Sequence, residues 1–404
     1  MKNWILAFFI TLFISVNLFS QGVWTQKASF PGSARGDAFS FSLGTKGYII
    51  AGSNSNSWFN DVWEYNASSN SWSQKQNFIS TARWQGVSFN IGAKGYIGTG
   101  QDGSSIQHND FWQYNPATDS WTQKANVPTT GRNFAVGFSI GNKGYIGTGL
   151  NGTSVYFHDL WEYDTLANTW SQKADFPAGG RLTAVGLSIG TKGYIGLGKD
   201  SIGTFKNDFW EYDPISDSWT QKTNYAGGIR EEMDGSHFII GSYGYVGTGR
   251  AVVSSSWVYY NDFWEYNPSN DSWVQILNYP GNARIGASNF SINNKGYIGL
   301  GFIQIPVLTA FNDLWEFTPD STENVNEINF DNCFSVSPNP TTGKIEIQNP
   351  NYKMEKIKMF NALGEKVVET RSSKLDISNQ PSGVYFVHIT CKEGTAVKKI
   401  ILNK

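Results

Sequence analysis

The sequence predicts an all-β protein in which six four-stranded units close into a ring and a small β-sandwich follows. An octet typified by NDFWEYNP at residues 261–268 occurs six times, and a Gly-Tyr run such as KGYIGTG precedes the copies. Gly, Asn, Asp and Pro punctuate β-branched and aromatic runs about every 8 to 12 residues, without helical periodicity. Four-stranded units that repeat about every 40 to 50 residues are typical of a β-propeller, here a six-bladed one.

The chain begins with a segment typical of a secretory signal peptide. Lys2 precedes an apolar run at residues 4–19 that is short for a membrane span, and the small or polar residues Ser20 and Gly22 follow. We therefore expect residues 1–20 to be a signal peptide and the mature chain to be extracytoplasmic without a membrane span. A membrane anchor is the alternative interpretation. The net charge of -2 argues against nucleic acid as a partner.

Each unit of the predicted ring should supply four strands, which we name a to d. Strand a follows an Arg, strand b is the Gly-Tyr run, strand c is the octet, and strand d starts at a second Trp. We number the repeats one to six by their octets, whose Asp residues are Asp61, Asp110, Asp159, Asp208, Asp262 and Asp313. The Arg residues that open the repeats are Arg35, Arg83, Arg132, Arg181, Arg230 and Arg284.

The second Trp predicts how the ring closes. It follows the first five octets, but the sixth octet runs into TPDSTENVNEINFDN without a Trp, while Trp24 stands alone before the first Arg. We therefore expect the strand at Trp24 to complete repeat six, which closes the ring without leaving a free sheet edge.

The repeated residues at 21–317 resemble the kelch repeat, with an Arg at the start of the unit, Gly residues after strand b, and Tyr and Trp on strands c and d. The resemblance implies a kelch-type propeller in which each octet Trp packs between neighbouring blades. One departure is that the Gly-Gly pair of the family is Gly-Thr-Gly or Gly-Leu-Gly here, as at 98–100 and 196–198.

The last 72 residues, 333–404, have a different texture: no Trp, eleven basic residues and six acidic ones. Alternating runs split by Pro, Gly and Asn predict a small β-sandwich, joined by a polar linker at 318–332. PNPTTG at 338–343, PSGVYFV at 381–387 and a basic last strand resemble the type A C-terminal sorting domain of the type IX secretion system of Bacteroidota. That resemblance implies secretion or surface display, with the secretion machinery as partner of 333–404. A binding module is the alternative, and whether Cys333 and Cys391 pair is open.

Kelch propellers also include a copper-radical oxidase of galactose, whose cofactor needs a Cys cross-linked to a Tyr and several His ligands. Residues 22–317 contain no Cys and three His, so this inventory excludes that chemistry. No zinc-protease, nucleophile-elbow or phosphate-loop motif occurs either, and the sequence indicates no metal and no cofactor.

The remaining candidate site is the loop face, which we define as the side formed by the b–c and d–a connections. Trp58, Trp257 and Tyr260 are the candidate ligand-binding residues there, because exposed aromatic rings stack on sugars or grip peptides. In five of the repeats the residue two before the octet Asp could instead pack at the start of strand c; these are Phe59, His108, Phe157, Tyr260 and Phe311.

The six opening Arg residues are further candidates, because they should form a ring near the mouth of the central channel. A guanidinium suits bidentate bonds to a carboxylate or a phosphate of a ligand. A structural clamp in each repeat is the alternative interpretation.

Repeat five breaks the pattern and suggests a second function. The distance from Arg to the Gly of Gly-Tyr is 14 residues there and 12 in the other repeats. Arg230, Glu231, Glu232 and His237, with Asp234 nearby, could form an acid–base group as in kelch mutarotases of sugar acids. An exposed acidic bulge is the alternative. The first expectation is a secreted or surface binding module for a glycan or a protein, and the second is a mutarotase or epimerase that uses Arg230 with Glu231 or Glu232.

Overall fold

The computed structural model describes residues 22–231, 235–304, 306–320, 334–348, 354–361, 365–391 and 394–404. These residues form strands, turns and loops and no helix, which confirms the all-β prediction. Among them there is accordingly no helix that could cross a membrane. Two compact units divide the chain, residues 1–320 and residues 321–404. The predicted signal peptide, most of the predicted linker, Glu232, Asp234 and Cys333 lie outside the described residues.

The described strands of the first unit build six four-stranded antiparallel sheets, each of which holds one octet. Repeat one contains β2 (Phe39–Leu43), β3 (Lys46–Ile50), β4 (Val62–Asn66) and β5 (Ser71–Lys75); repeat two contains β7 (Val87–Ile91), β8 (Lys94–Gly98), β10 (Phe111–Asn115) and β11 (Ser120–Lys124); and repeat three contains β12 (Val136–Ile140), β13 (Lys143–Gly147), β14 (Leu160–Asp164) and β15 (Thr169–Lys173). Repeat four contains β17 (Val185–Ile189), β18 (Lys192–Gly196), β20 (Phe209–Asp213) and β21 (Ser218–Lys222), and repeat five contains β22 (His237–Ile240), β23 (Tyr243–Gly247), β26 (Phe263–Asn267) and β27 (Ser272–Gln275).

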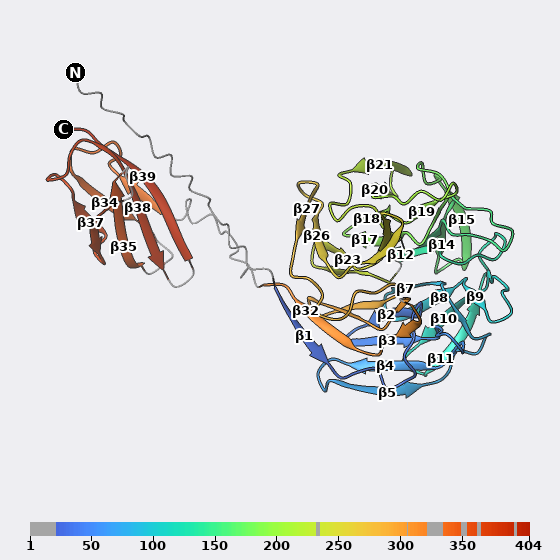
Figure 1. The fold of residues 1–404 in the computed structure, drawn as a ribbon. Coiled ribbons are helices and arrows are strands. Elements are labelled where there is room, and N and C mark those ends of the chain that lie inside the picture. The colour runs from blue at the N-terminus through green and yellow to red at the C-terminus, as the bar shows by residue number, and fades with distance from the viewer. Residues whose placement is uncertain are drawn as a thin grey trace, which may run out of the picture. The chain divides into compact units, whose positions relative to one another are not determined.

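The sixth sheet joins the two ends of the propeller. Its strands are β28 (Ser288–Ile292), β29 (Lys295–Gly299), β32 (Leu314–Thr318) and β1 (Val23–Lys27). Strand β1 pairs antiparallel with β32, with Trp24 opposite Phe317, and Figure 1 shows the two strands side by side. The N-terminal strand therefore completes repeat six, as the position of Trp24 predicted.

Neighbouring sheets pack through the alternation of side chains along each strand. In β2, Phe39, Phe41 and Leu43 are buried, while the two Ser residues between them are half-buried. The Gly of the Gly-Tyr run leaves room for an aromatic ring of the adjacent sheet, since a Cβ at Gly47 would lie 2.3 Å from the ring of Phe290. The recurrent Gly is thus a requirement of packing between repeats.

The octet Tyr fills the space between sheets more completely than the octet Trp. Tyr65 is fully buried, whereas Trp63 is half-buried and donates from Nε1 to Asp61 at 2.8 Å. The octet Trp also packs between neighbouring sheets, as predicted, because Trp63 lies against the cluster of buried residues that joins repeats six and one. The second Trp joins repeats directly, because its Nε1 donates to a carbonyl of the preceding repeat; the pairs are Trp24 with Leu277, Trp72 with Ala28, Trp121 with Gln76, Trp170 with Ala125, Trp219 with Ala174, and Trp273 with Thr223.

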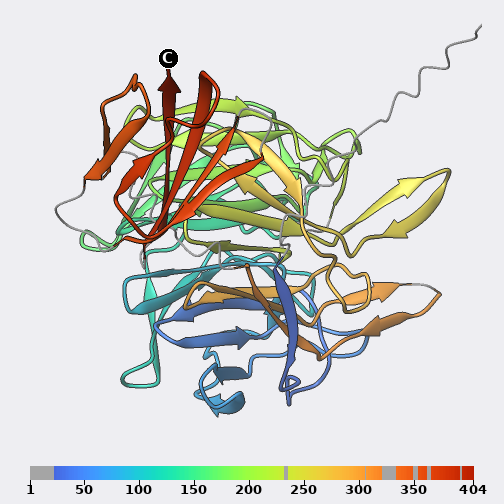
Figure 2. The same cartoon turned by 90° about the vertical axis from the view of Figure 1, so that its left-hand side faces the viewer.

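Additional hairpins interrupt the regular pattern in the b–c connections of repeats five and six. They are β24 (Arg250–Val253) with β25 (Ser256–Tyr259), and β30 (Phe302–Gln304) with β31 (Leu308–Ala310). Figure 2 shows them in yellow and orange, projecting side by side. Repeats two and four have only short strand pairs near this position: β6 (Arg83–Trp84) with β9 (Gln101–Asp102), and β16 (Arg181–Leu182) with β19 (Lys199–Asp200).

The second unit is a small β-sandwich. One sheet contains β33 (Ser335–Ser337), β34 (Lys344–Gln348) and β37 (Lys374–Asp376), and the other contains β35 (Met354–Asn361), β36 (Lys366–Thr370), β38 (Gly383–Cys391) and β39 (Gly394–Leu402). Its core includes Ile345, Ile357, Met359, Val387 and Ile400. Since this core contains residues of the second unit alone, the unit has a hydrophobic core of its own.

Candidate functional site

The six opening Arg residues lie inside the repeats, and each one is at most 1% exposed. Arg132 shows the arrangement: its guanidinium donates to both carboxylate oxygens of Asp159, at 2.7 and 2.8 Å, and to the carbonyl of Thr148 at 2.8 Å. The corresponding ion pairs in the other repeats are Arg35–Asp61, Arg83–Asp110, Arg181–Asp208, Arg230–Asp262 and Arg284–Asp313.

The residue that accepts the third hydrogen bond stands at the position where the sequence departs from a Gly-Gly pair. Thr148 lies between the two Gly residues of its Gly-Thr-Gly and has a φ of 60°, a left-handed conformation that directs its carbonyl to Arg132. A non-Gly residue pays about 1 kcal/mol for this conformation, and the charged hydrogen bond offsets that cost. The Arg, the octet Asp and the residue that corresponds to Thr148 therefore form one clamp in each repeat.

Aromatic rings cover the clamp from the loop face. Phe59, Phe157, Tyr260 and Phe311 lie over Arg35, Arg132, Arg230 and Arg284, with 3.8 to 4.5 Å between the guanidinium carbon and the ring centroid. Tyr260, which we proposed as a ligand contact, is thus half-buried on Arg230. The placement of the six Arg residues favours the structural clamp and not an open ring at the channel mouth.

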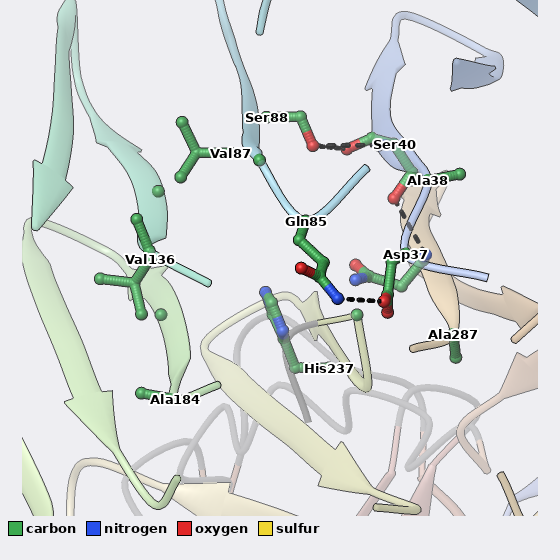
Figure 3. Close-up of a pocket in the computed structure, with 16 residues that line it drawn as sticks. Asp37, Ala38, Ser40, Gln85, Val87, Ser88, Val136, Ala184, His237 and Ala287 are labelled. Carbon is green, nitrogen blue, oxygen red and sulfur yellow. Dashed lines mark hydrogen bonds between the residues drawn. The ribbon is translucent and has the colours of Figure 1, made fainter. Parts of the chain in front are cut away.

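A polar cavity of about 80 Å³ lies between the inner strands of the ring. Its lining includes Asp37, Gln85, His237 and Asn289 (Figure 3). Gln85 links two neighbours, because it donates from Nε2 to Asp37 at 3.1 Å and accepts at Oε1 from Asn133 at 2.8 Å. Gly36, next to Asp37, exchanges backbone hydrogen bonds with Ser53 of the b–c connection, so the cavity lies at the end of the channel that opens toward the loop face.

A chain of backbone hydrogen bonds runs around the same end of the channel. The N–H of Asp37 donates to the carbonyl of Gly286 at 2.8 Å, and that of Gln85 donates to Asp37 at 3.1 Å. Phe134 and Thr183 continue the series at 2.9 and 3.3 Å. Each residue stands two positions after an opening Arg and has a positive φ, so this strained position is repeated to tie neighbouring repeats together.

His237 has a buried, unpartnered nitrogen in this cavity. Its Nδ1 is buried and makes no hydrogen bond within the described structure, and Figure 3 shows the ring beside Gln85 and Asp37. Loss of hydration lowers the pKa of the imidazole from 6.5 to about 4. His237 is therefore neutral at physiological pH.

A second group of side chains lies on the loop face between repeats four and five. Trp257 is 41% exposed, the guanidinium of Arg250 lies 4.0 Å from its ring centroid, and the ring of Phe205 lies 5.9 Å away. Lys199 is 5.5 Å from the ring of Phe205. We call Lys199, Phe205, Arg250 and Trp257 the Trp257 cluster. It combines an accessible indole with two cations.

Glu231 lies at the base of this cluster. It is 4% exposed, exchanges backbone hydrogen bonds with Arg250, and its carboxylate accepts from Arg250 Nε at 3.3 Å. Burial raises the pKa of Glu231, against the opposing effect of the charges of Arg250 and Lys199. Glu231 is therefore a buried, paired carboxyl group and not part of an exposed bulge.

Trp58 is equally accessible but has different surroundings. It is 42% exposed in the b–c connection of repeat one, and a Cβ at Gly103 of repeat two would lie 3.0 Å from its ring. Its near contact is thus a backbone of the neighbouring loop, whereas Trp257 contacts cations and another ring.

Comparison with known proteins agrees with both parts of this architecture. Residues 34–77 match the kelch motif, and residues 335–403 match the family described as the secretion system C-terminal sorting domain.

This is a kelch-repeat protein with a C-terminal sorting domain of the type IX secretion system.

The sorting domain interacts with the secretion machinery and directs this kelch-repeat protein to secretion and attachment at the cell surface. In the solved structure of YjhT the same fold occurs, with a TM-score of 0.63 at 16% identity over 73% of this chain and 98% of that chain. That likeness concerns the propeller fold alone.

Curated relatives of the kelch-repeat protein include the N-acetylneuraminate epimerase of Shigella flexneri serotype 5b (strain 8401), 30% identical over 29% of this chain and 34% of that protein. N-acetylneuraminate epimerase 2 of Escherichia coli O6:H1 is 30% identical over 27% of this chain and 31% of that protein. The chain therefore spans about a third of the length of the curated relatives it matches.

The residues of the predicted acid–base group do not lie together in the kelch-repeat protein. Arg230 is held in its clamp by Asp262, and Glu231 pairs with Arg250. His237 lines the polar cavity between the inner strands of the ring. Glu232 lies outside the described residues. Among the described residues, no group of three or more His, Cys, Asp or Glu side chains is placed to hold a metal ion.

Sequence reasoning missed Arg250 and the polar side chains that line the cavity between the inner strands. One signal was available: Arg250 is the only Arg at residues 22–317 that lies outside the repeat register. Asp37 and Gln85 carried no comparable signal, because the residues two positions after the opening Arg differ in type from repeat to repeat.

Proposed function

We propose that the propeller is a cell-surface or secreted binding module that recognises an acidic glycan through the Trp257 cluster. The observation that carries the proposal is the exposed indole of Trp257 with Arg250 at 4.0 Å and Phe205 at 5.9 Å. Indole rings stack on the apolar face of a sugar. Cations beside such a ring provide partners for a sugar carboxylate.

The charge of the cluster supports an acidic ligand. Arg250 is partly neutralised by Glu231, but Lys199 makes no ion pair with a carboxylate among the described residues. Lys206 and Asp200 nearby pair with each other at 2.7 Å. Among the residues that the structure describes here, one positive charge in excess remains beside the ring. The curated relatives are named for N-acetylneuraminate, a sugar that carries a carboxylate.

The test is binding of the secreted protein to a sialylated glycan and to its desialylated form. Trp257→Ala should weaken binding by about 30-fold or more, since an aromatic anchor typically contributes at least about 2 kcal/mol. Trp58→Ala is the matched control, because Trp58 has the same exposure without the cations, and it should leave binding unchanged. Binding that survives Trp257→Ala would contradict the proposal.

The second candidate function is an epimerase or mutarotase of a sugar acid, which rests on the names of the curated relatives and on the raised pKa of Glu231. A carboxyl group whose pKa is raised toward neutral pH suits general acid–base catalysis. Arg230 does not support this function, because Asp262 and the carbonyls of Thr248 and Gly227 occupy its guanidinium.

Anomer exchange of N-acetylneuraminate, followed by NMR with and without the protein, tests the enzymatic candidate. Acceleration that Glu231→Gln abolishes while glycan binding persists would support it. Exchange at the uncatalysed rate in the unmodified protein would exclude it for this sugar.

A further inference from the structure

The outer face of the larger sheet in the sorting domain has an unusual composition. The inner face of this sheet supplies Ile357, Met359 and Val387 to the core, which the smaller sheet covers. Because side chains alternate along a strand, Phe360, Phe386 and His388 project on the other side. The outer face of a sheet in a small sandwich is ordinarily polar.

Aromatic and aliphatic residues form a continuous strip on this outer face. Phe360 lies opposite Phe386 across β35 and β38, and its ring centroid is 4.8 Å from that of His388 in an edge-to-face arrangement. Phe386 is 38% exposed. Val384 and Ile401 lie opposite each other on β38 and β39 and are half-buried.

Lysine side chains surround the strip. Lys399 is opposite Phe386, Lys366 is opposite Phe360, and Lys358 is opposite His388. Lys356 and Lys366 both bind Glu369, at 2.6 and 2.5 Å, and these bonds lower the pKa of Glu369 to about 2, which keeps it ionised. The four Lys and one Glu leave an excess of three positive charges.

We propose that this aromatic-basic face, made of Phe360, Phe386, His388 and the surrounding Lys residues, is the docking surface for a protein of the secretion machinery whose contact region is acidic around an apolar recess. An aromatic anchor inside a charged rim is the usual composition of a protein interface. The sorting domain interacts with the secretion machinery, and this face supplies both an anchor and a charge for it. This proposal is independent of the ligand of the propeller.

A lipid surface fits these residues less well. Basic patches that bind anionic lipids are clusters of Lys and Arg without intervening acids, whereas Glu369 lies among the lysines here. Two rings in register on neighbouring strands also form a compact contact area, which suits a shaped recess of a protein.

Export of the full chain in a cell that carries the type IX machinery tests the proposal. We expect Phe386→Ala and Lys399→Glu each to lower the exported fraction by about tenfold, as loss of an interface anchor does. Lys374→Glu, on the smaller sheet with its side chain 76% exposed, is the matched control and should leave export unchanged. Phe386→Tyr should restore export.

Unchanged export of both variants would overturn the proposal, and so would an equal loss with Lys374→Glu. Lys399→Glu keeps the test decisive if Phe386→Ala unfolds the domain, because Lys399 is an exposed residue. Flotation of the purified full chain with vesicles of phosphatidylglycerol distinguishes a lipid partner from a protein partner. Vesicle binding that Lys399→Glu abolishes would assign the face to lipid and overturn the assignment to a protein partner.

Discussion

Arg132 donates two hydrogen bonds to Asp159, at 2.7 and 2.8 Å, and is fully buried while it does so. The same pair occurs in all six repeats and joins the start of strand a to the start of strand c. Burial of a charge is tolerated only when its partners remain in place. The pair therefore makes the two loops of each repeat depend on each other.

Arg132→Met should lower the free energy of unfolding by about 3 to 5 kcal/mol, because it leaves Asp159 without its partner. The double variant Arg132→Met, Asp159→Leu should lose less than the sum of the two single variants, since no lone charge remains. Urea unfolding of the four proteins measures this. Additive losses would contradict the interpretation as a clamp, and a loss of glycan binding without a loss of stability would point instead to a ligand contact.

Trp24 holds the chain ends together through the same contacts that the second Trp makes inside other repeats. Its Nε1 donates to Leu277 at 3.0 Å, and its ring lies 4.9 Å from Phe317 and 5.4 Å from Phe263. Trp24→Ala should cost about 3 to 5 kcal/mol. Trp72→Ala in repeat one is the control, with an expected loss of similar size.

A chain that starts at residue 31 should aggregate through the exposed edge of β32. Light scattering checks this aggregation, and a peptide of residues 22–30 should suppress it.

The closure and the clamp show why the fold was predictable. Six copies of one octet reveal strand order and spacing, and the isolated Trp24 reveals which strand is displaced, because each copy obeys the same packing rules. The sequence also placed Arg and Asp at fixed positions in each repeat. It left open whether Arg bound a ligand or a neighbour, since guanidinium chemistry suits both.

The candidate site was less predictable because its residues lie outside the repeat register. Arg250 and Glu231 are 19 residues apart and meet through a backbone bridge that depends on where the irregular segment of repeat five returns to register. Trp257 was identified as an accessible ring, but the hairpin β24–β25 that brings Arg250 to it was not. The polar cavity between the inner strands is lined by residues from several repeats. The sequence of any one repeat therefore does not reveal it.

His237 should make the propeller less stable in mild acid. The folded-state pKa of about 4 lies below the ordinary 6.5 of an unfolded chain, so between these values the unfolded chain binds a proton that the folded protein does not. Stability therefore falls as pH drops from about 6.5 to 4, by at most about 3 kcal/mol, while above 6.5 the group has no effect. His237→Gln should flatten this part of the curve in pH-dependent urea unfolding. The same slope in both proteins would exclude His237 as its source.

Removal of the sorting domain should leave the propeller intact but prevent its export. The clusters of buried residues in the first unit and the core of the second unit have no members in common. Strand β1 closes repeat six within residues 23–318. A chain that ends at Asp320 therefore retains every contact of its own core, including the bond from the Gly22 N–H to the Asp320 carboxylate at 2.6 Å.

We expect the thermal midpoint of its propeller transition to stay within about 2 °C of that of the full chain, because a change of 1 kcal/mol shifts the midpoint by only a few degrees. The same chain should remain inside a cell that exports the full protein. A lowered midpoint would show that the sorting domain stabilises the propeller, and undiminished export would show that the address lies elsewhere in the chain.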